Sequence, residues 1–198
     1  YRLVGVSRHT ATKRFTDAAS GSFARGTKIT LGDGSMRPIE DLNPGDIILT
    51  RDAGRQPVQH IGHATVRATG QFAPVVITKG ALHNDQDLVL RADHRLFIHQ
   101  RTDRLQAGRP EVVVKARQLV DGKTVLRRRG GYIDYFQLVL ASQHIIYAEG
   151  IATESHFGST RDGLQSLTDT AAHHAYEVAD TLIPKSETST LLRQASTG

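Results

Sequence analysis

The chain of 198 residues contains no cysteine and a single methionine, Met36. Without cysteine it cannot form a disulfide, build a thiolate metal site or use a thiol as a nucleophile. No stretch approaches the roughly 20 consecutive apolar residues that a membrane-spanning helix requires. These absences exclude a disulfide-stabilised scaffold and a helical membrane protein. The composition, with 38% hydrophobic and 23% charged residues, is typical of a globular domain.

The charge of the chain is modestly basic and unevenly distributed. The formal net charge is +5, but residues 156–198 hold only 3 of the 25 Lys/Arg and 5 of the 20 Asp/Glu. A basic excess of this size usually serves solubility, so we expect no nucleic-acid partner; steeply salt-dependent binding to DNA would indicate one. Because the sequence begins at Tyr1, we also expect an excised fragment or mature piece of a longer protein, without visible targeting signals.

Residues 22–155 are predicted to form an all-β domain. Short β-branched and aliphatic runs alternate there with turn sequences such as Gly32-Asp33-Gly34 and Asn43-Pro44-Gly45. The expected strands are 27–31, 46–50, 58–67, 74–78, 87–90, 95–99, 111–115, 123–126, 135–140 and 145–148. Residues 38–42 and 115–120 could each form one helical turn. Many short strands without long intervening helices favour an all-β fold over a parallel α/β one.

The two ends of the chain differ from this central region. Residues 1–21 lack hydrophobic periodicity and are predicted to be a flexible N-terminal leader. Residues 156–198 form a C-terminal extension in which 170–182 fit a short amphipathic helix that Pro184 ends, followed by a disordered tail. The sequence therefore predicts three parts, a leader (1–21), a β domain (22–155) and an extension (156–198).

Several segments of the β domain carry a family resemblance. Residues 21–29 read Gly-Ser-Phe-Ala-Arg-Gly-Thr-Lys-Ile, and residues 39–46 read Ile-Glu-Asp-Leu-Asn-Pro-Gly-Asp. Leu-Arg-Ala-Asp-His-Arg-Leu-Phe follows at 90–97, and His-Ile-Ile-Tyr-Ala-Glu-Gly at 144–150. In this order the segments resemble the Hint domain, the autoprocessing fold shared by inteins and hedgehog C-terminal regions, and especially its bacterial intein-like form. That family opens with Cys-Phe-x-x-Gly-Thr-x-Ile, so Ser22 stands where the family has cysteine.

The resemblance covers about residues 20–155 and implies both a fold and an activity. The fold would be a horseshoe of short twisted strands, and the activity would be autocatalytic scission of the Gly21–Ser22 peptide bond. Ser22 would be the nucleophile, His94 the proton donor to the leaving amide and His144 a secondary helper. The substrate would be the chain's own N-terminal flank, completed by water or a small nucleophile. The resemblance further implies a secreted protein, and the proposed reaction requires no cofactor. We also expect a monomer without a metal site and without a membrane or nucleic-acid partner.

The residues at 21 and 22 also suit this chemistry on physical grounds. A hydroxyl directly after the scissile carbonyl closes a five-membered ring on it, so the attack is intramolecular and most of its entropic cost is already met. The N-to-O acyl shift is uphill because amide resonance is lost, and glycine tolerates a strained peptide bond. The departing nitrogen needs a proton, which an imidazole such as that of His94 can supply near neutral pH.

Four positions depart from the family pattern. A serine hydroxyl is far less acidic than a thiol, so Ser22 is expected to slow or abolish cleavage and leave a trapped or inactive precursor. Arg91 replaces a threonine or serine and brings a positive charge near the scissile amide. Glu154 and Ser155 stand where inteins have His-Asn, and neither can cyclise, so full splicing is not expected. The alternative function is a catalytically inert Hint-fold module that serves structure or interaction in a larger secreted protein.

The remaining histidine and acidic residues give weaker signals. Asp93 neighbours His94, but adjacent residues of a strand face opposite sides, so it is not expected to be the partner of His94. His60 and His63 have an odd spacing, which splits the pair across two faces of a strand, and we expect surface histidines rather than a zinc site.

Overall fold

The computed structural model describes residues 21–99 and 111–157. The expected leader before Gly21, the expected helix at 170–182 and the expected tail lie outside the described residues. None of the described helices is long and apolar enough to span a membrane.

Fifteen short strands make up almost all regular structure in the described ranges. They are β1 (Phe23–Ala24), β2 (Lys28–Thr30), β3 (Met36–Pro38), β4 (Ile47–Thr50), β5 (Gly54–Pro57), β6 (His60–Arg67), β7 (Val75–Ile77), β8 (Leu88–Leu90), β9 (Arg95–His99), β10 (Glu111–Lys115), β11 (Val125–Arg127), β12 (Tyr132–Leu140), β13 (Ile145–Ala148), β14 (Ile151–Glu154) and β15 (His156–Phe157). Three single-turn 3-10 helices accompany them, namely η1 (Ile39–Asp41), η2 (Gly70–Phe72) and η3 (Ala116–Leu119).

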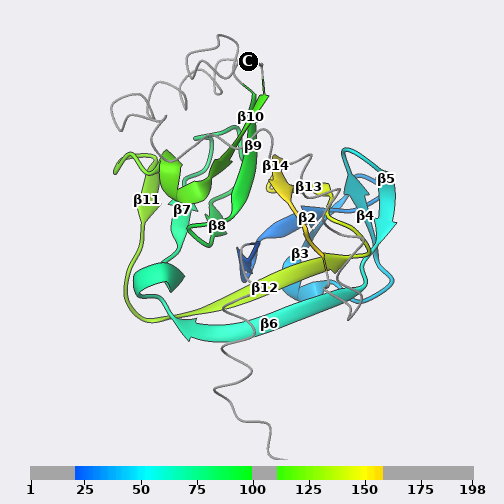
Figure 1. Ribbon diagram of the computed structural model, residues 1–198, viewed down its shortest axis with the longest axis horizontal. Helices are drawn as coiled ribbons and strands as arrows, with labels where there is room; N and C mark the ends of the chain where they lie inside the picture. Colours follow the sequence, from blue (N-terminus) through cyan, green and yellow to red (C-terminus); the bar gives the residue numbers. More distant parts are fainter. Residues whose placement is uncertain (1–20, 100–110, 158–198) are drawn as a thin grey trace, which may run out of the picture.

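The strands form two sheets (Figure 1). The first sheet has the order β11-β7-β8-β1-β12-β15, with β6 paired over its whole length to β12. The second has the order β10-β9-β14-β13-β2-β3, with β4 on β13 and β5 on β4. Every named pair is antiparallel except β12–β15. The predicted all-β fold is therefore confirmed.

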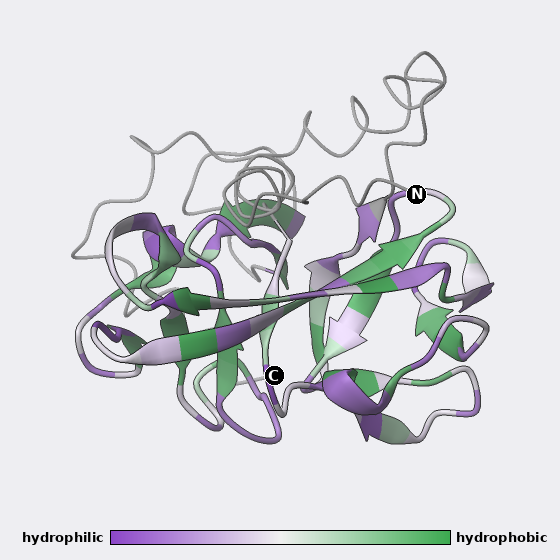
Figure 2. Cartoon of the chain, turned by 90° about the horizontal axis from the view of Figure 1, so that it is seen from below, coloured by the Kyte–Doolittle hydropathy of each residue, from purple (hydrophilic) through white to green (hydrophobic). Residues whose placement is uncertain are grey.

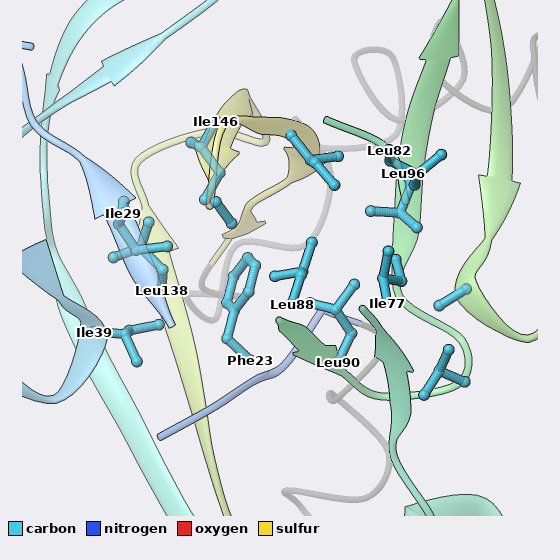
Figure 3. Close-up of a cluster of buried hydrophobic side chains, with 14 of the residues drawn as sticks. Phe23, Ile29, Ile39, Ile77, Leu82, Leu88, Leu90, Leu96, Leu138 and Ile146 are labelled. Atoms are coloured by element: carbon cyan, nitrogen blue, oxygen red, sulfur yellow. The ribbon is translucent and has the colours of Figure 1, made fainter. Parts of the chain in front are cut away.

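A single large hydrophobic core joins the two sheets. Phe23, Leu90 and Leu138 of the first sheet are buried in the same cluster as Ile29 and Ile146 of the second (Figure 3). Successive residues along a strand face opposite sides, so strands such as β7 and β8 each contribute two side chains to this cluster. Figure 2 shows the resulting mixture of hydrophobic and hydrophilic positions along the strands. Burial of Phe23 anchors β1 at the centre of the first sheet.

The strands at 95–99, 111–115 and 145–148 have the predicted bounds, and those of the other predicted strands lie within three residues. Gly32-Asp33-Gly34 connects the β2–β3 hairpin as expected, with Gly34 at a positive φ of 87°. The strands β1, β3, β5, β14 and β15 and the turn η2 were not predicted. They are two to four residues long and carry no alternation of their own, so their conformation depends on pairing with distant strands.

Candidate functional site

The start of β1 places the Gly21–Ser22 peptide bond inside the protein. Phe23 pairs with Leu90 of β8 on one side and with Phe136 of β12 on the other. The carbonyl oxygen of Ser22 accepts a hydrogen bond of 3.1 Å from the backbone N–H of Arg91, which continues this pairing by one residue. Ser22 is 0% exposed, and its hydroxyl has no hydrogen-bond partner.

His94 lies beside the same peptide bond. A turn between β8 and β9, closed by a 3.1 Å bond from the His94 N–H to the Arg91 carbonyl, carries the residue, and its ring packs edge-on against Phe23 at 4.5 Å between centroids. Nδ1 is 3.3 Å from the carbonyl oxygen of Ser22. A Cβ added to Gly21 would lie 3.9 Å from His94 Cε1. The Nδ1–Cε1 edge of the imidazole therefore runs along Gly21 and Ser22.

The environment of His94 keeps the imidazole neutral. The residue is 0% exposed, and burial lowers its pKa to about 4, although the backbone of Ser22 opposes that shift. The Glu154 backbone also favours the charged form, but Nε2 is buried and has no hydrogen-bond partner. Because the Ser22 carbonyl can only accept, Nδ1 carries the proton and Nε2 presents a free lone pair. The ring can thus donate at one nitrogen and accept at the other.

Arg91 is the third buried polar residue at this bond. The residue is 4% exposed, and its Nε and Nη1 atoms have no hydrogen-bond partner. The guanidinium carbon lies 5.0 Å from the centroid of the Phe72 ring, while the Tyr135 hydroxyl donates a 3.1 Å bond to the Phe72 carbonyl. Burial lowers the pKa of Arg91 and raises that of Tyr135. Phe72 therefore contacts the Arg91 guanidinium through its ring and the Tyr135 hydroxyl through its backbone carbonyl.

His144 forms a separate group with Asp52 and Ser155. One carboxylate oxygen of Asp52 lies 3.0 Å from His144 Nδ1, and the other accepts a 2.9 Å bond from the Ile145 N–H. The Ser155 hydroxyl accepts a 2.9 Å bond from the His144 N–H, and the Ser155 N–H donates a 2.8 Å bond to the His144 carbonyl. Asp52 thus holds the turn that ends in His144, and His144 in turn fixes Ser155.

A protein-family model describing the Hint domain matches residues 21–160. The chain belongs to the Hint domain family. No curated protein matches the chain. Among solved structures, a bacterial intein-like domain from Clostridium thermocellum is 13% identical, covers 68% of this chain and 97% of its own, and has a TM-score of 0.43. A DnaB intein from Synechocystis sp. PCC 6803 is 15% identical, covers 70% and 99%, and has a TM-score of 0.42.

In this Hint domain the predicted site residues fall into two places. Gly21, Ser22, His94 and Arg91 come together at the start of β1, and the Glu154 carbonyl lies 3.7 Å from where a Cβ of Gly21 would be. No hydrogen bond within the described ranges joins His144 to Ser22; His144 bonds Asp52 and Ser155 instead.

The two acidic candidates are engaged in ion pairs. The Glu154 carboxylate lies 3.0 Å from Arg95 Nη1, so only its backbone carbonyl faces Gly21. Asp93 pairs with Arg117 rather than with His94, which agrees with the prediction that Asp93 is not the partner of His94.

Sequence reasoning missed Asp52, Phe72 and Tyr135. Asp52 sits in a turn between β4 and β5, and it meets His144 only because β4 pairs with β13. Phe72 and Tyr135 surround Arg91 through contacts between segments that are 19 to 63 residues apart in sequence. No local pattern marks such contacts, so only the Hint pairing scheme could have pointed to them.

Proposed function

We propose that this Hint domain opens its own Gly21–Ser22 peptide bond through an ester formed on Ser22. The observation that carries the proposal is the buried imidazole of His94, whose Nδ1–Cε1 edge runs along both residues of that bond. A buried hydroxyl without a hydrogen-bond partner, on the residue directly after the scissile carbonyl, supports it further. The Ser22 hydroxyl and the Gly21 carbonyl would then react at the buried start of β1, with the His94 imidazole at the backbone of Ser22.

The first step would be an N-to-O acyl shift. Ser22 Oγ attacks the Gly21 carbonyl carbon, forming the Oγ–C bond, and the C–N bond to the Ser22 nitrogen then breaks. The proton lost by Oγ ends on that nitrogen, so the step is an isomerisation that yields an ester and a free amine. Because the attack closes a five-membered ring within one chain, proximity lowers the barrier.

His94 would supply the proton that the departing nitrogen needs, and the proton lost by Oγ would restore the imidazole. A neutral imidazole is suited to this because Nε2 can accept a proton while the Nδ1 proton is given away. The burial that lowers the pKa of His94 to about 4 keeps this neutral form at physiological pH. Nδ1 already bonds the backbone of Ser22, the residue whose nitrogen has to be protonated.

Water or a small nucleophile would complete the cleavage. Its attack on the ester releases the N-terminal segment with a carboxylate, or an equivalent acyl derivative, and restores the Ser22 hydroxyl. Splicing with ligation is not part of the proposal, because Glu154 and Ser155 lack the side-chain amide that intein-type cyclisation needs. The substrate is therefore the flank that precedes Ser22, and no cofactor enters the steps.

An inert Hint-fold module is the second candidate. The Arg95–Glu154 ion pair supports it, because it places a structural contact where an intein has reactive residues. The low acidity of a serine hydroxyl points the same way, since Ser22 would react more slowly than the cysteine of the family pattern.

Intact-mass spectrometry of the full chain separates the two candidates. The chain is incubated at neutral pH with hydroxylamine, which attacks esters far faster than amides, and in matched buffer without it. The proposal predicts a fragment that begins at Ser22 together with the hydroxamate of residues 1–21, both accumulating faster with hydroxylamine. An unchanged mass in both samples would support the inert module.

A further inference from the structure

Arg91 is a buried cation that has no salt-bridge partner among the described residues, although the charge of Asp93 acts on it from a longer distance. Seven buried polar side-chain atoms of the described residues lack a hydrogen-bond partner, and four of them belong to Ser22, Arg91 and His94. Within residues 21–99 and 111–157 no carboxylate lies at salt-bridge distance from Arg91. A buried charge without a salt-bridge partner destabilises a fold. Such a cost, concentrated beside one peptide bond, calls for a functional explanation.

The strand register puts the side chains of Ser22 and Arg91 on the same face of the first sheet. Phe23 and Leu90 are directly paired, and both side chains are part of the core. Since neighbouring side chains alternate, Ser22 and Arg91 project from the opposite, outer face, one across from the other. His94 packs against Phe23 on the core side. The imidazole therefore reaches position 22 at its backbone, through the Ser22 carbonyl, whereas the guanidinium belongs to the face from which the Ser22 side chain projects.

The connection from β6 to β7 covers this outer face. This connection leads from β6, which lies beside β12, to β7, which lies beside β8, and it contains Phe72. Tyr135 pairs with Ala24 and shares the outer face, and its hydroxyl bonds the Phe72 carbonyl in that connection. The Arg91 guanidinium lies against the Phe72 ring. The cation is thus held under a low-dielectric cover, where its field acts strongly on nearby atoms.

We propose that Arg91 activates Ser22 electrostatically, by stabilising the negative charge that develops on Oγ and on the tetrahedral intermediate as the hydroxyl attacks Gly21. This inference rests on the proposed function and deepens it. The guanidinium forms and breaks no bond, and the proton lost by Oγ still ends on the Ser22 nitrogen. Arg91 cannot serve as the proton acceptor, because a guanidinium keeps its protons. A serine nucleophile and an arginine in place of the family's threonine or serine would thus act as a pair.

The first test measures the charge effect without requiring cleavage. Ser22→Cys introduces the only thiol of the chain, because the sequence has no cysteine. His94→Ala is added so that the bond stays intact and the imidazole contributes to neither sample. Thiolate absorbance is then followed against pH with Arg91 present and with Arg91→Met. The other ionisable or charged groups about position 22 are common to both chains: Tyr135 on β12, the Arg95–Glu154 pair and Asp93, which is bound to Arg117.

At a pH below the titration midpoint, the chain that keeps Arg91 should hold at least about tenfold more thiolate. Equal thiolate fractions would overturn the inference. Replacement of a buried unpaired charge by methionine is expected to preserve the fold, which thermal unfolding checks. If the Met chain does not fold, Arg91→Ala and Arg91→Lys replace it, with more thiolate expected for Lys than for Ala.

The second test measures the reaction in chains that retain His94. Arg91→Met should slow hydroxylamine-dependent cleavage at Ser22 on the order of 100-fold, as loss of one group that stabilises a developing oxyanion does. With Ser22→Cys the same change should cost about tenfold or less, because a thiol is already acidic. Equal losses in both backgrounds would contradict the inference. If none of the chains is cleaved but the thiolate fractions differ, the proposed function is wrong. The action of Arg91 on position 22 would still be supported.

Discussion

The two histidines of the predicted site occupy opposite kinds of environment. His94 is fully buried beside Gly21–Ser22, and Nε2, the Ser22 hydroxyl and two Arg91 nitrogens around it have no hydrogen-bond partner. His144 is bonded to Asp52 and Ser155 through side chain and backbone. Unsatisfied buried groups destabilise a fold, whereas satisfied ones hold it together. The comparison supports the proposal that the first group carries the chemistry, and it indicates that the second supports the fold.

Exchanging the two serines for alanine should give the largest contrast between the groups. Ser22→Ala removes the only atom that can form the ester, so hydroxylamine-dependent cleavage should vanish. Ser155→Ala removes a hydroxyl that accepts a backbone bond, and cleavage should continue at a comparable rate. Intact mass over time reports both. Cleavage that survives Ser22→Ala, or ends with Ser155→Ala in a folded chain, would reverse the assignment.

Replacing His94 or His144 by alanine should give a smaller difference in cleavage rate between the two groups than the serine variants do. His94→Ala should slow cleavage by roughly 100- to 1,000-fold, within the usual range for the loss of a general acid–base group. His144→Ala should slow it by tenfold at most, because His144 bonds Asp52 and Ser155 rather than Ser22. Rates from quenched samples analysed by mass provide the measurement. Equal losses for the two variants would mean that the site extends to His144.

The buried histidine should also make stability depend on pH. Its pKa is lowered from 6.5 to about 4 in the folded state, so the unfolded chain binds more protons between these values. Stability contributed by neutral His94 is therefore complete above about pH 6.5 and is lost as the pH falls toward 4, by about 3 kcal/mol in total. Urea unfolding between pH 4.5 and 7 measures this slope. His94→Gln should flatten the curve, and an unchanged slope would show that burial does not hold this ring neutral.

The support group is best tested through Asp52. Asp52→Ala leaves the Ile145 N–H and His144 Nδ1 without their acceptor and should lower the free energy of unfolding by about 1–3 kcal/mol. Asp93→Ala is a matched control, because it removes a half-exposed ion pair with Arg117 that is worth less than about 1 kcal/mol. Urea denaturation of the two variants gives the difference. Equal losses would show that Asp52 is no more than a surface charge.

The sequence allowed the fold class, the strands with clear alternation and the contact between Ser22 and His94 to be predicted. Strands such as β9 and β10 are long enough for β-branched residues to mark them, and ordered motifs identify the segments that meet. The two-residue β1 could not be predicted as a strand, although it positions the scissile bond. Its pairing with β8 and β12 follows from the burial of Phe23 between segments 67 and 113 residues away.

The environment of Arg91 could not be predicted either. Its charge was expected near the scissile amide, but the strand register and the Phe72 cover decide which face the side chain takes. The partner of His144 was missed for a similar reason, because a turn aspartate such as Asp52 usually caps its own turn. Here the neighbouring strand pair brings it to a distant histidine.

The most direct test of the central claim restores a thiol at the start of β1. The Ser22→Cys chain is incubated at neutral pH with a thiol reagent or with hydroxylamine, and its intact mass is followed. If position 22 attacks its own preceding carbonyl with His94 at hand, a fragment that begins at residue 22 should accumulate faster than from the serine chain. A folded Ser22→Cys chain that stays intact under both reagents would contradict the claim.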